Sequence, residues 1–317
     1  MARSTTMESS STWVVIAALA GNAAVAVIKF FAAFLSGSAA LMSEGIHSLV
    51  DTADQGLLLY GLRRARKPAD EAFPFGYGKE VYFWSFVVAT QLFSIGALAS
   101  IYEGVLHILH QSAIEDATLG YIVLGLAFVF EASSWSFAVF NFSRSKGRRS
   151  YVEAIRVAKD PTVFVVLFED SAALLGIVIA FLGIFLSRKT GIPWFDGVAS
   201  ILIGVILGVT AILLAREVKG LLIGESANRP VVKGIRELAA SFPEIRAVNE
   251  ALTMHVGPNF ILVNLSVAFA EQLNAGEVAS AAAHLDVAIK ERYPRVKRVF
   301  IEAKTAFLAR SVRTRTE

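Results

Sequence analysis

Long apolar runs occupy the first two thirds of the chain and end near Arg216, where charged and polar residues return. A helix that crosses a membrane needs roughly 20 mostly apolar residues. Six segments meet this requirement, at about 12–36, 39–62, 80–105, 117–142, 160–187 and 194–215. The pattern therefore predicts an α-helical membrane protein with six transmembrane helices in residues 1–219, followed by a separate domain in residues 220–317.

The tail has the shorter periodicities of a small α+β domain between about residues 225 and 305. Pro230 suits the first turn of a helix, and Gly257, Pro258 and Asn259 suit the turn of a hairpin. The predicted order is helix, strand, strand, helix, strand, at 230–241, 247–256, 260–269, 275–292 and 296–303. This order fits a small sheet with its helices on one face.

The loops indicate how the predicted helices are oriented. Residues 63–67 read RRARK, and basic residues recur between the fourth and fifth helices, whereas the loop after the third helix carries only the acidic Glu115 and Asp116. Lys and Arg are enriched in cytoplasmic loops, so we expect both termini in the cytoplasm, with Arg188 and Lys189 as a minor exception. No small-residue cleavage site follows the first apolar run, which we interpret as a membrane helix rather than a removed signal.

Composition supports the membrane assignment and restricts the chemistry. The chain is 55% hydrophobic and 18% charged, whereas soluble domains are about 45–50% apolar and about 25% charged. The net charge of +3 comes from basic residues beside apolar segments, which is not the pattern of a nucleic-acid-binding surface. Without cysteine, a metal site must use His, Asp, Glu or backbone oxygen.

The second predicted helix contains the clearest candidate metal ligands. His47 and Asp51 are four residues apart and share a helix face, so both could reach one cation at about 2.0–2.2 Å. Glu44 lies on roughly the same side and is a candidate to orient the imidazole. A hydrogen bond between His47 and Asp51 that joins helices is the alternative interpretation.

The fifth predicted helix supplies the complementary acids, Glu169 and Asp170. Adjacent buried carboxylates repel each other, and a divalent cation relieves that repulsion. The alternative is one protonated carboxyl group that acts as a hydrogen-bond donor. Glu131 in the fourth helix and Asn22 in the first are weaker candidates, either for a proton path or for contacts between helices. We expect His107 and His110 to be solvated, although this pair could hold a metal.

Residues 37–51 (GSAALMSEGIHSLVD) resemble the second-helix signature of the cation diffusion facilitator family, and residues 73–80 (FPFGYGKE) are similar to its motif before the third helix. Asp196 and Gly197 at the start of the sixth helix also match. The resemblance implies a homodimer that exports a divalent cation against protons by alternating access, with a ferredoxin-like tail. It also implies metal ligands at His47, Asp51 and Asp170.

The sequence departs from the family pattern in ways that resemble the zinc transporter nine branch. Val166 stands where the family has a ligand four residues before its aspartate, and Glu169 is the obvious substitute. Tyr77 replaces the usual loop histidine, which argues against a metal site near Asp70. His255 and His284 are single tail histidines, which we interpret as packing or surface residues.

Together these patterns predict a zinc transporter without a resident cofactor, whose cargo is the dication and whose partners are a second copy, the lipid bilayer and protons. Manganese, iron or cobalt are alternative cargoes, because nitrogen and oxygen donors suit several ions. A non-transporting dimer partner is a further alternative. A membrane metalloenzyme is disfavoured, because His-Glu-x-x-His is absent. The compact loops favour a bacterial inner membrane.

Overall fold

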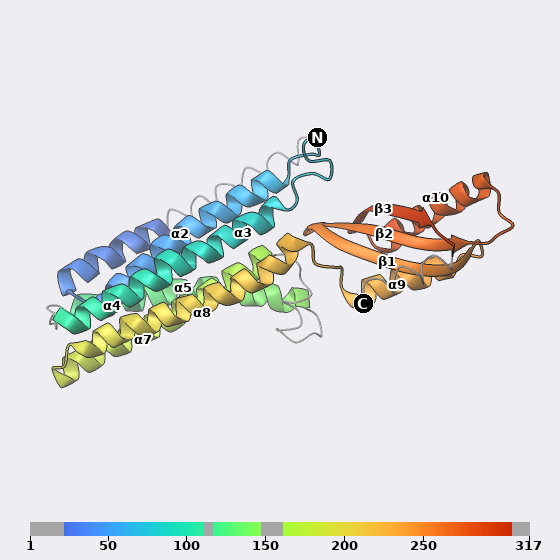
Figure 1. The fold of residues 1–317 in the computed structure, drawn as a ribbon. Helices are drawn as coiled ribbons and strands as arrows, with labels where there is room; N and C mark the ends of the chain where they lie inside the picture. Colours follow the sequence, from blue (N-terminus) through green and yellow to red (C-terminus); the bar gives the residue numbers. More distant parts are fainter. Residues whose placement is uncertain (1–21, 111–116, 147–160, 306–317) are drawn as a thin grey trace. The chain divides into compact units, whose positions relative to one another are not determined.

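The computed structural model describes residues 22–110, 117–146 and 161–305, which form two compact units (Figure 1). The first unit contains the described residues up to Arg63 together with Val81–Lys219. The second contains Arg64–Glu80 and the chain from Gly220 onward. Sequence reasoning assigned residues 64–80 to the membrane domain, whereas the structure groups them with the tail.

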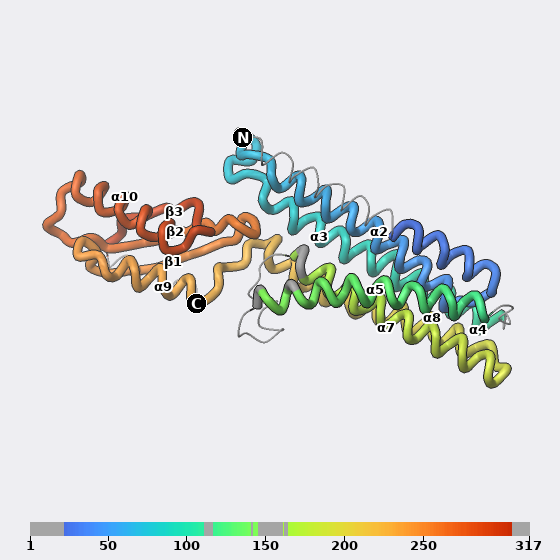
Figure 2. Tube along the Cα trace, turned by 180° about the vertical axis from the view of Figure 1, so that it is seen from behind, coloured from blue at the N-terminus to red at the C-terminus, as the bar shows by residue number. Residues whose placement is uncertain are grey.

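The first unit is a bundle of long helices, and consecutive helices run in opposite directions (Figures 1 and 2). A π-helical stretch, η1, interrupts the third predicted span. The elements are the helix Asn22–Ser36, α2 (Ala39–Ala65), α3 (Glu80–Gln91), η1 (Leu92–Ala97), α4 (Leu98–His110), α5 (Ala117–Lys146), α7 (Pro161–Thr190) and α8 (Trp194–Ile223).

Four helical runs in the described part of the chain are long and apolar enough to cross a membrane, namely Glu80–His110, Ala117–Arg144, Phe164–Thr190 and Trp194–Ile223. Helix α2 is also long enough, but it carries the ionisable residues Glu44, Asp51 and Asp54 within its length. Residues 12–21 of the first predicted span lie outside the described residues. The helical membrane fold is thus confirmed, and four of the six predicted spans meet the length and composition required.

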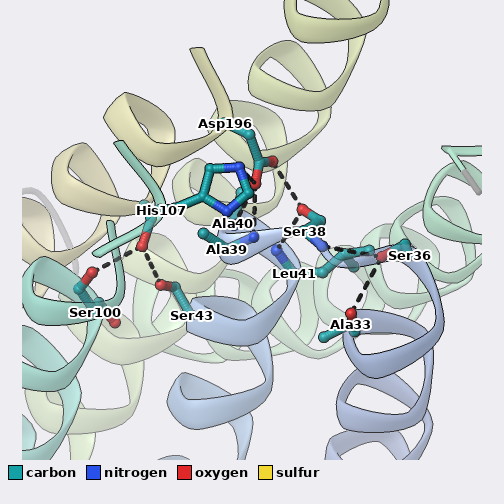
Figure 3. A network of polar contacts seen from close by, with 11 residues as sticks. Ala33, Ser36, Ser38, Ala39, Ala40, Leu41, Ser43, Ser100, His107 and Asp196 are labelled. Atoms are coloured by element: carbon teal, nitrogen blue, oxygen red, sulfur yellow. Dashed lines mark hydrogen bonds and ion pairs between the residues drawn. The ribbon is translucent and has the colours of Figure 1, made fainter. Parts of the chain in front are cut away.

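The start of α2 is determined by contacts with α8 (Figure 3). Gly37 has a φ of 68°, which reverses the chain before the helix. The Ser38 hydroxyl accepts from the Leu41 N–H at 3.2 Å, as an N-terminal capping residue does. The carboxylate of Asp196 accepts from the N–H groups of Ala39 and Ala40 at 2.6 and 3.2 Å. A negative group is favourable at this helix end, so the contact joins two helices that are far apart in sequence.

The tail has the predicted order of elements, with α9 (Arg229–Ala240), β1 (Ile245–Gly257), β2 (Phe260–Phe269), α10 (Ala275–Arg292) and β3 (Val296–Ala303). The central strand β2 pairs antiparallel with β1 and parallel with β3. Ile261, Val263, Leu265 and Val267 alternate along β2 and share one core cluster with Ile235 of α9 and Leu285 of α10. Both helices therefore cover the same face of the sheet, as the pattern predicted.

The loop before α3 belongs with the tail because its backbone lies against the β1–β2 hairpin. A Cβ at Gly78 would lie 2.6 Å from the Val256 carbonyl oxygen, so only glycine permits this approach. Phe75 also makes an edge-to-face contact with Phe300 of β3, with ring centroids 6.5 Å apart. These contacts join residues that are far apart in sequence, which explains why the chain pattern alone did not reveal them.

Candidate metal centre

Helix α2 carries many of the buried polar side chains of the first unit, including Ser43, Glu44, His47, Ser48 and Asp54. Asp51 is slightly exposed, with 14% of its side chain accessible. Spacings of four and three residues keep His47, Asp51 and Asp54 on one face of the helix. Ionisable groups inside a membrane bundle are expensive and mark candidate ion sites. This face of α2 is therefore the starting point of the site.

His47 and Asp51 lie together, as their spacing predicted. Nδ1 of His47 is 3.3 Å from Oδ1 of Asp51. The contact lacks hydrogen-bond geometry, and neither imidazole nitrogen has a hydrogen-bond partner among the described residues. Buried polar groups are normally paired, so an unpaired imidazole beside a carboxylate is a donor set that is free to bind a ligand.

A polar cavity of about 20 Å³ is lined by residues of the helix Asn22–Ser36, α2, α5 and α7. This volume is sufficient for a single water molecule or ion. The Ser134 hydroxyl of α5 donates to Oδ2 of Asp170 at 3.3 Å, which helps to orient that carboxylate. The cavity therefore brings two predicted ligands, Asp51 and Asp170, to one small space. Its polar lining comprises Asn22, Ser48, Asp51, Gln55, Glu131 and Asp170, together with Ser134.

Glu169 is buried on a different face of α7 from Asp170. Its side chain is not part of the cavity lining, and its Oε1 has no hydrogen-bond partner among the described residues. It lies two helical turns from Gly176, where a Cβ would meet Oε1 of Glu44 in α2. Glu169 therefore faces α2 directly, while Asp170 faces the cavity.

A buried ion pair lies beside this site, and the sequence analysis did not identify it. The Lys29 ammonium donates to Oε2 of Glu44 at 3.0 Å and to the Ser48 hydroxyl at 2.7 Å, and Lys29 and Glu44 are both fully buried. The available signal was a single lysine in the middle of an apolar run, because such residues need a partner inside a membrane.

The three candidates for supporting roles have different surroundings. Glu44 contacts Lys29 and does not hydrogen-bond to His47, whose two nitrogens have no such partner in the described structure. Asn22 donates to Oε1 of Gln55 at 3.0 Å across the cavity lining. Glu131 lines the same cavity as Asp51 and Asp170. Asn22 and Glu131 therefore border the predicted ligands, whereas Glu44 is engaged elsewhere.

The ligands are near one another but do not form a completed metal site. Within residues 22–110, 117–146 and 161–305, no three His, Asp or Glu side chains converge closely enough to hold one ion. His47 with Asp51, and Asp51 with Asp170 across the cavity, are the contacts on which a site would be built. Side-chain movements are needed to bring these donors onto a single cation.

The other four histidines lie away from the candidate site and differ in burial. His107 was expected to be solvated, but it is buried, with Nε2 3.7 Å from Oδ2 of Asp196 (Figure 3). That prediction was wrong because Asp196 comes from a helix that is remote in sequence. His110 is exposed, as expected. In the tail, His255 is buried and His284 is exposed.

The loop between α2 and α3 has a compact local structure. The Tyr77 hydroxyl donates to Oδ2 of Asp70 at 2.6 Å, and the Phe73 N–H donates to Oδ1 at 2.8 Å. The hydrogen bond from Tyr77, assisted by the one from Phe73, lowers the pKa of Asp70. The same bond raises the pKa of the Tyr77 hydroxyl. The Asp70 carboxylate is thus hydrogen-bonded by Tyr77 within this loop.

Comparison with known proteins gives a consistent assignment. The family model for the cation efflux transmembrane domain matches residues 15–223. The human mitochondrial proton-coupled zinc antiporter SLC30A9 is 33% identical over 247 residues, which are 77% of this chain and 43% of that protein. Metal tolerance protein C4 of Arabidopsis thaliana is 30% identical over 261 residues, 82% of this chain and 57% of that protein. The chain thus spans about half the length of these curated relatives.

The MamM CTD D249N structure in its nickel form is 18% identical and covers 25% of this chain and 98% of its own, with a TM-score of 0.23. That score is too low to support a statement about fold. The family match instead covers every described helix of the bundle. Together with the relatives in human and Arabidopsis, it confirms the predicted resemblance, and the chain belongs to the cation efflux family, in the branch that resembles zinc transporter nine.

Proposed function

We propose that this protein transports a divalent metal cation, zinc in the first instance, across a membrane in exchange for protons. The observation that carries the proposal is the polar cavity in which Asp51 of α2 and Asp170 of α7 share one small space beside His47. The family membership and the printed function of the human relative, a proton-coupled zinc antiporter, support it further.

In this proposal one ion binds to His47, Asp51 and Asp170, and Glu169 or a water molecule completes its coordination. One imidazole nitrogen and carboxylate oxygens are suitable donors for tetrahedral zinc. The ion joins α2 to α7, so binding changes the contact between two helices. Release on the other side requires the two helices to separate again, which is the basis of alternating access.

Proton exchange follows from the chemistry of these ligands. Metal binding requires a neutral imidazole and ionised carboxylates, so the metal and protons compete for the same groups. When the ion leaves, protons take its place and neutralise the buried acids. Each transport cycle therefore moves metal one way and protons the other.

Manganese, iron or cobalt remain the alternative cargo, because the carboxylates near the cavity outnumber the histidines. Asp51, Glu131 and Asp170 all line the cavity, and His47 is the adjacent imidazole. Oxygen donors suit harder ions better than zinc, while metal affinity alone does not decide selectivity. A panel of ions therefore has to be part of the test.

We further propose a homodimer in a bacterial inner membrane, with both termini in the cytoplasm. The basic residues at 63–67 support this orientation through the enrichment of Lys and Arg in cytoplasmic loops. Labelling of single cysteines introduced at the two termini of this cysteine-free chain tests the orientation directly.

The decisive experiment is transport by the purified full chain in vesicles. Zinc, manganese, iron and cobalt are added outside, and a pH-sensitive dye inside reports proton movement. We expect zinc-dependent proton flux that is lost in His47→Ala and Asp51→Ala variants that remain folded and inserted. The absence of flux with any ion in the unchanged protein would leave the non-transporting dimer partner as the better explanation.

A further inference from the structure

Asp54 is a buried carboxylate that the mechanism above does not use. It lies in α2, three residues beyond Asp51, and is 0% exposed. Both of its carboxylate oxygens lack a hydrogen-bond partner among the residues that the structure describes. Buried acids are normally paired, hydrogen-bonded or bound to a metal. An unpaired one at this position therefore requires an explanation.

The same bundle shows how a buried aspartate is satisfied when its role is structural. Asp196 is also 0% exposed, and its oxygens accept from the Ser38 hydroxyl and from the N–H groups of Ala39 and Ala40 (Figure 3). Asp54 has none of these donors. The two oxygens of Asp54 are therefore available to a positively charged ligand.

Glu169 of α7 is a second buried acid that faces α2, because it lies two turns from Gly176, the residue of α7 that approaches Glu44. Glu169 is itself 4% exposed, and its Oε1 has no partner within the described structure. Two buried acids on neighbouring helices therefore each have at least one unsatisfied oxygen.

The helix register places Asp54 about one turn from the level of Glu169. Helices α2 and α7 run antiparallel (Figures 1 and 2), and a Cβ on Gly176 would collide with Oε1 of Glu44. Two turns along each helix from this contact, Asp51 lies level with Glu169, and Glu169 is on the Gly176 face of α7. Asp54 follows one turn closer to the end of α2 that carries Arg63 and Arg64.

Neither acid belongs to the lining of the polar cavity. The nearby ammonium of Lys29 is engaged by Glu44 and Ser48 and does not neutralise them. A cation bound between α2 and α7 would compensate both charges, because opposite charge at close range stabilises a buried acid. The arrangement therefore points to a second position for a cation in the bundle, separate from the cavity.

We propose that Asp54 and Glu169 form a second binding station for the divalent cation, one helical turn from the His47–Asp51–Asp170 site. This inference rests on the proposed function. On the predicted orientation the station lies on the cytoplasmic side, so a cation moving outward meets it first. Glu169 belongs to both positions and passes the ion from one to the other.

The test uses Asp54→Asn in the full chain in zinc-loaded vesicle assays, with a thermal melt of the same preparation. The amide keeps the size of the side chain and removes its charge. Loss of a group that only supports a metal ligand lowers affinity by roughly 10–100-fold, and loss of a direct carboxylate ligand costs at least as much, so we expect KM for zinc to rise about tenfold or more. Since an unpaired buried charge is removed, we expect the melting temperature to stay equal or to rise.

Three variants make the result specific. Asp54→Glu restores a carboxylate and is expected to recover most of the zinc affinity. Glu169→Gln combined with Asp54→Asn is expected to be little worse than Glu169→Gln alone, because Glu169→Gln already removes the second site. Asp196→Asn is the matched control, an equally buried but fully partnered aspartate, whose substitution is expected to lower the melting temperature.

An unchanged KM in a folded Asp54→Asn variant overturns the proposal of a second cation site. A fall in melting temperature large enough to explain the lost activity overturns it as well. Failure of the proposed function looks different, because the unchanged protein then shows no metal-dependent flux at all. Zinc binding to Asp51→Ala by equilibrium dialysis provides a readout without transport. We expect Asp51→Ala to bind zinc weakly and the double variant Asp51→Ala/Asp54→Asn to lose this binding. Equal zinc binding by the single and the double variant also overturns the proposal.

Discussion

The ammonium nitrogen of Lys29 lies 3.0 Å from Oε2 of Glu44, and both side chains are completely buried between the helix Asn22–Ser36 and α2. The same nitrogen donates to the Ser48 hydroxyl, which lines the polar cavity. The pair therefore supports the wall of the candidate site. Because Lys29 neutralises Glu44, it leaves His47, Asp51 and Asp54 as the buried α2 donors available to a metal.

Replacing Lys29 alone is expected to destabilise the bundle strongly. Lys29→Met leaves Glu44 buried and unpaired, and breaking a buried ion pair in this way costs about 3–5 kcal/mol. A thermal melt in one detergent, followed by tryptophan fluorescence, measures the effect. The double variant Lys29→Met/Glu44→Gln is expected to recover most of the loss, because no uncompensated charge then remains. Additive losses in the double variant would contradict the pairing.

Gly176 is expected to be intolerant of even one extra methyl group. A Cβ at this position collides with Oε1 of Glu44, whose other oxygen is held by Lys29. Overpacking of a dense interior costs about 1–3 kcal/mol, so Gly176→Ala should lower the melting temperature. Gly125→Ala in α5 is the matched control, because nothing lies within 4 Å of its added Cβ. The control should be neutral or stabilising, and equal effects of the two substitutions would refute the contact.

Much of the architecture was predictable, because a helix that crosses a membrane needs an apolar run of about 20 residues, which is visible in the sequence. The predicted spans 39–62 and 160–187 correspond to α2 and α7 with ends shifted by a few residues. The sixth helix extends to Ile223, beyond the predicted 215, because residues after Arg216 continue the helix up to Gly224, which has a φ of 118°. Polarity therefore marks the edge of the apolar run, whereas glycine marks the end of the helix.

The candidate site was less predictable, because helix spacing does not identify partners on other helices. His47 and Asp51 are neighbours on one helix, and their spacing alone predicted their contact. Glu44 was assigned to the imidazole, but its partner is Lys29 on another helix. Asp54 was not singled out, although an ionisable residue inside a predicted span was an available signal; its lack of a partner is visible only in three dimensions.

The Asp70–Tyr77 hydrogen bond should give the loop before α3 a defined pH dependence. The folded pKa of Asp70 is lowered, mainly by the Tyr77 hydroxyl, so the bond contributes fully above the ordinary aspartate value of about 3.9. Its contribution is lost as the pH falls through the lower folded value. Tyr77→Phe should raise the pKa of Asp70 toward the ordinary value, and the loss then begins at higher pH.

The ¹³C resonance of the Asp70 carboxyl, titrated in selectively labelled protein, measures this shift. Tyr77→Phe keeps the aromatic contact with Phe73, whose centroid is 4.5 Å away, so the change isolates the hydroxyl. The remaining bond from the Phe73 N–H should leave the pKa of the variant somewhat below that of an unstructured aspartate. Identical titrations of the variant and the unchanged protein would show that the hydroxyl does not act on Asp70.

Asp196 should control the start of α2 rather than the metal chemistry. Its Oδ2 accepts from the N–H groups of Ala39 and Ala40, and its Oδ1 accepts from the Ser38 hydroxyl. Asp196→Ala leaves these buried donors unpaired, and each unpaired group costs about 1–3 kcal/mol. Amide hydrogen exchange should therefore accelerate at residues 39–41 while the α2 residues around Asp51 remain protected. Uniform acceleration along α2 would instead mean that Asp196 supports the whole bundle, and unchanged exchange would mean that Ser38 alone is a sufficient cap.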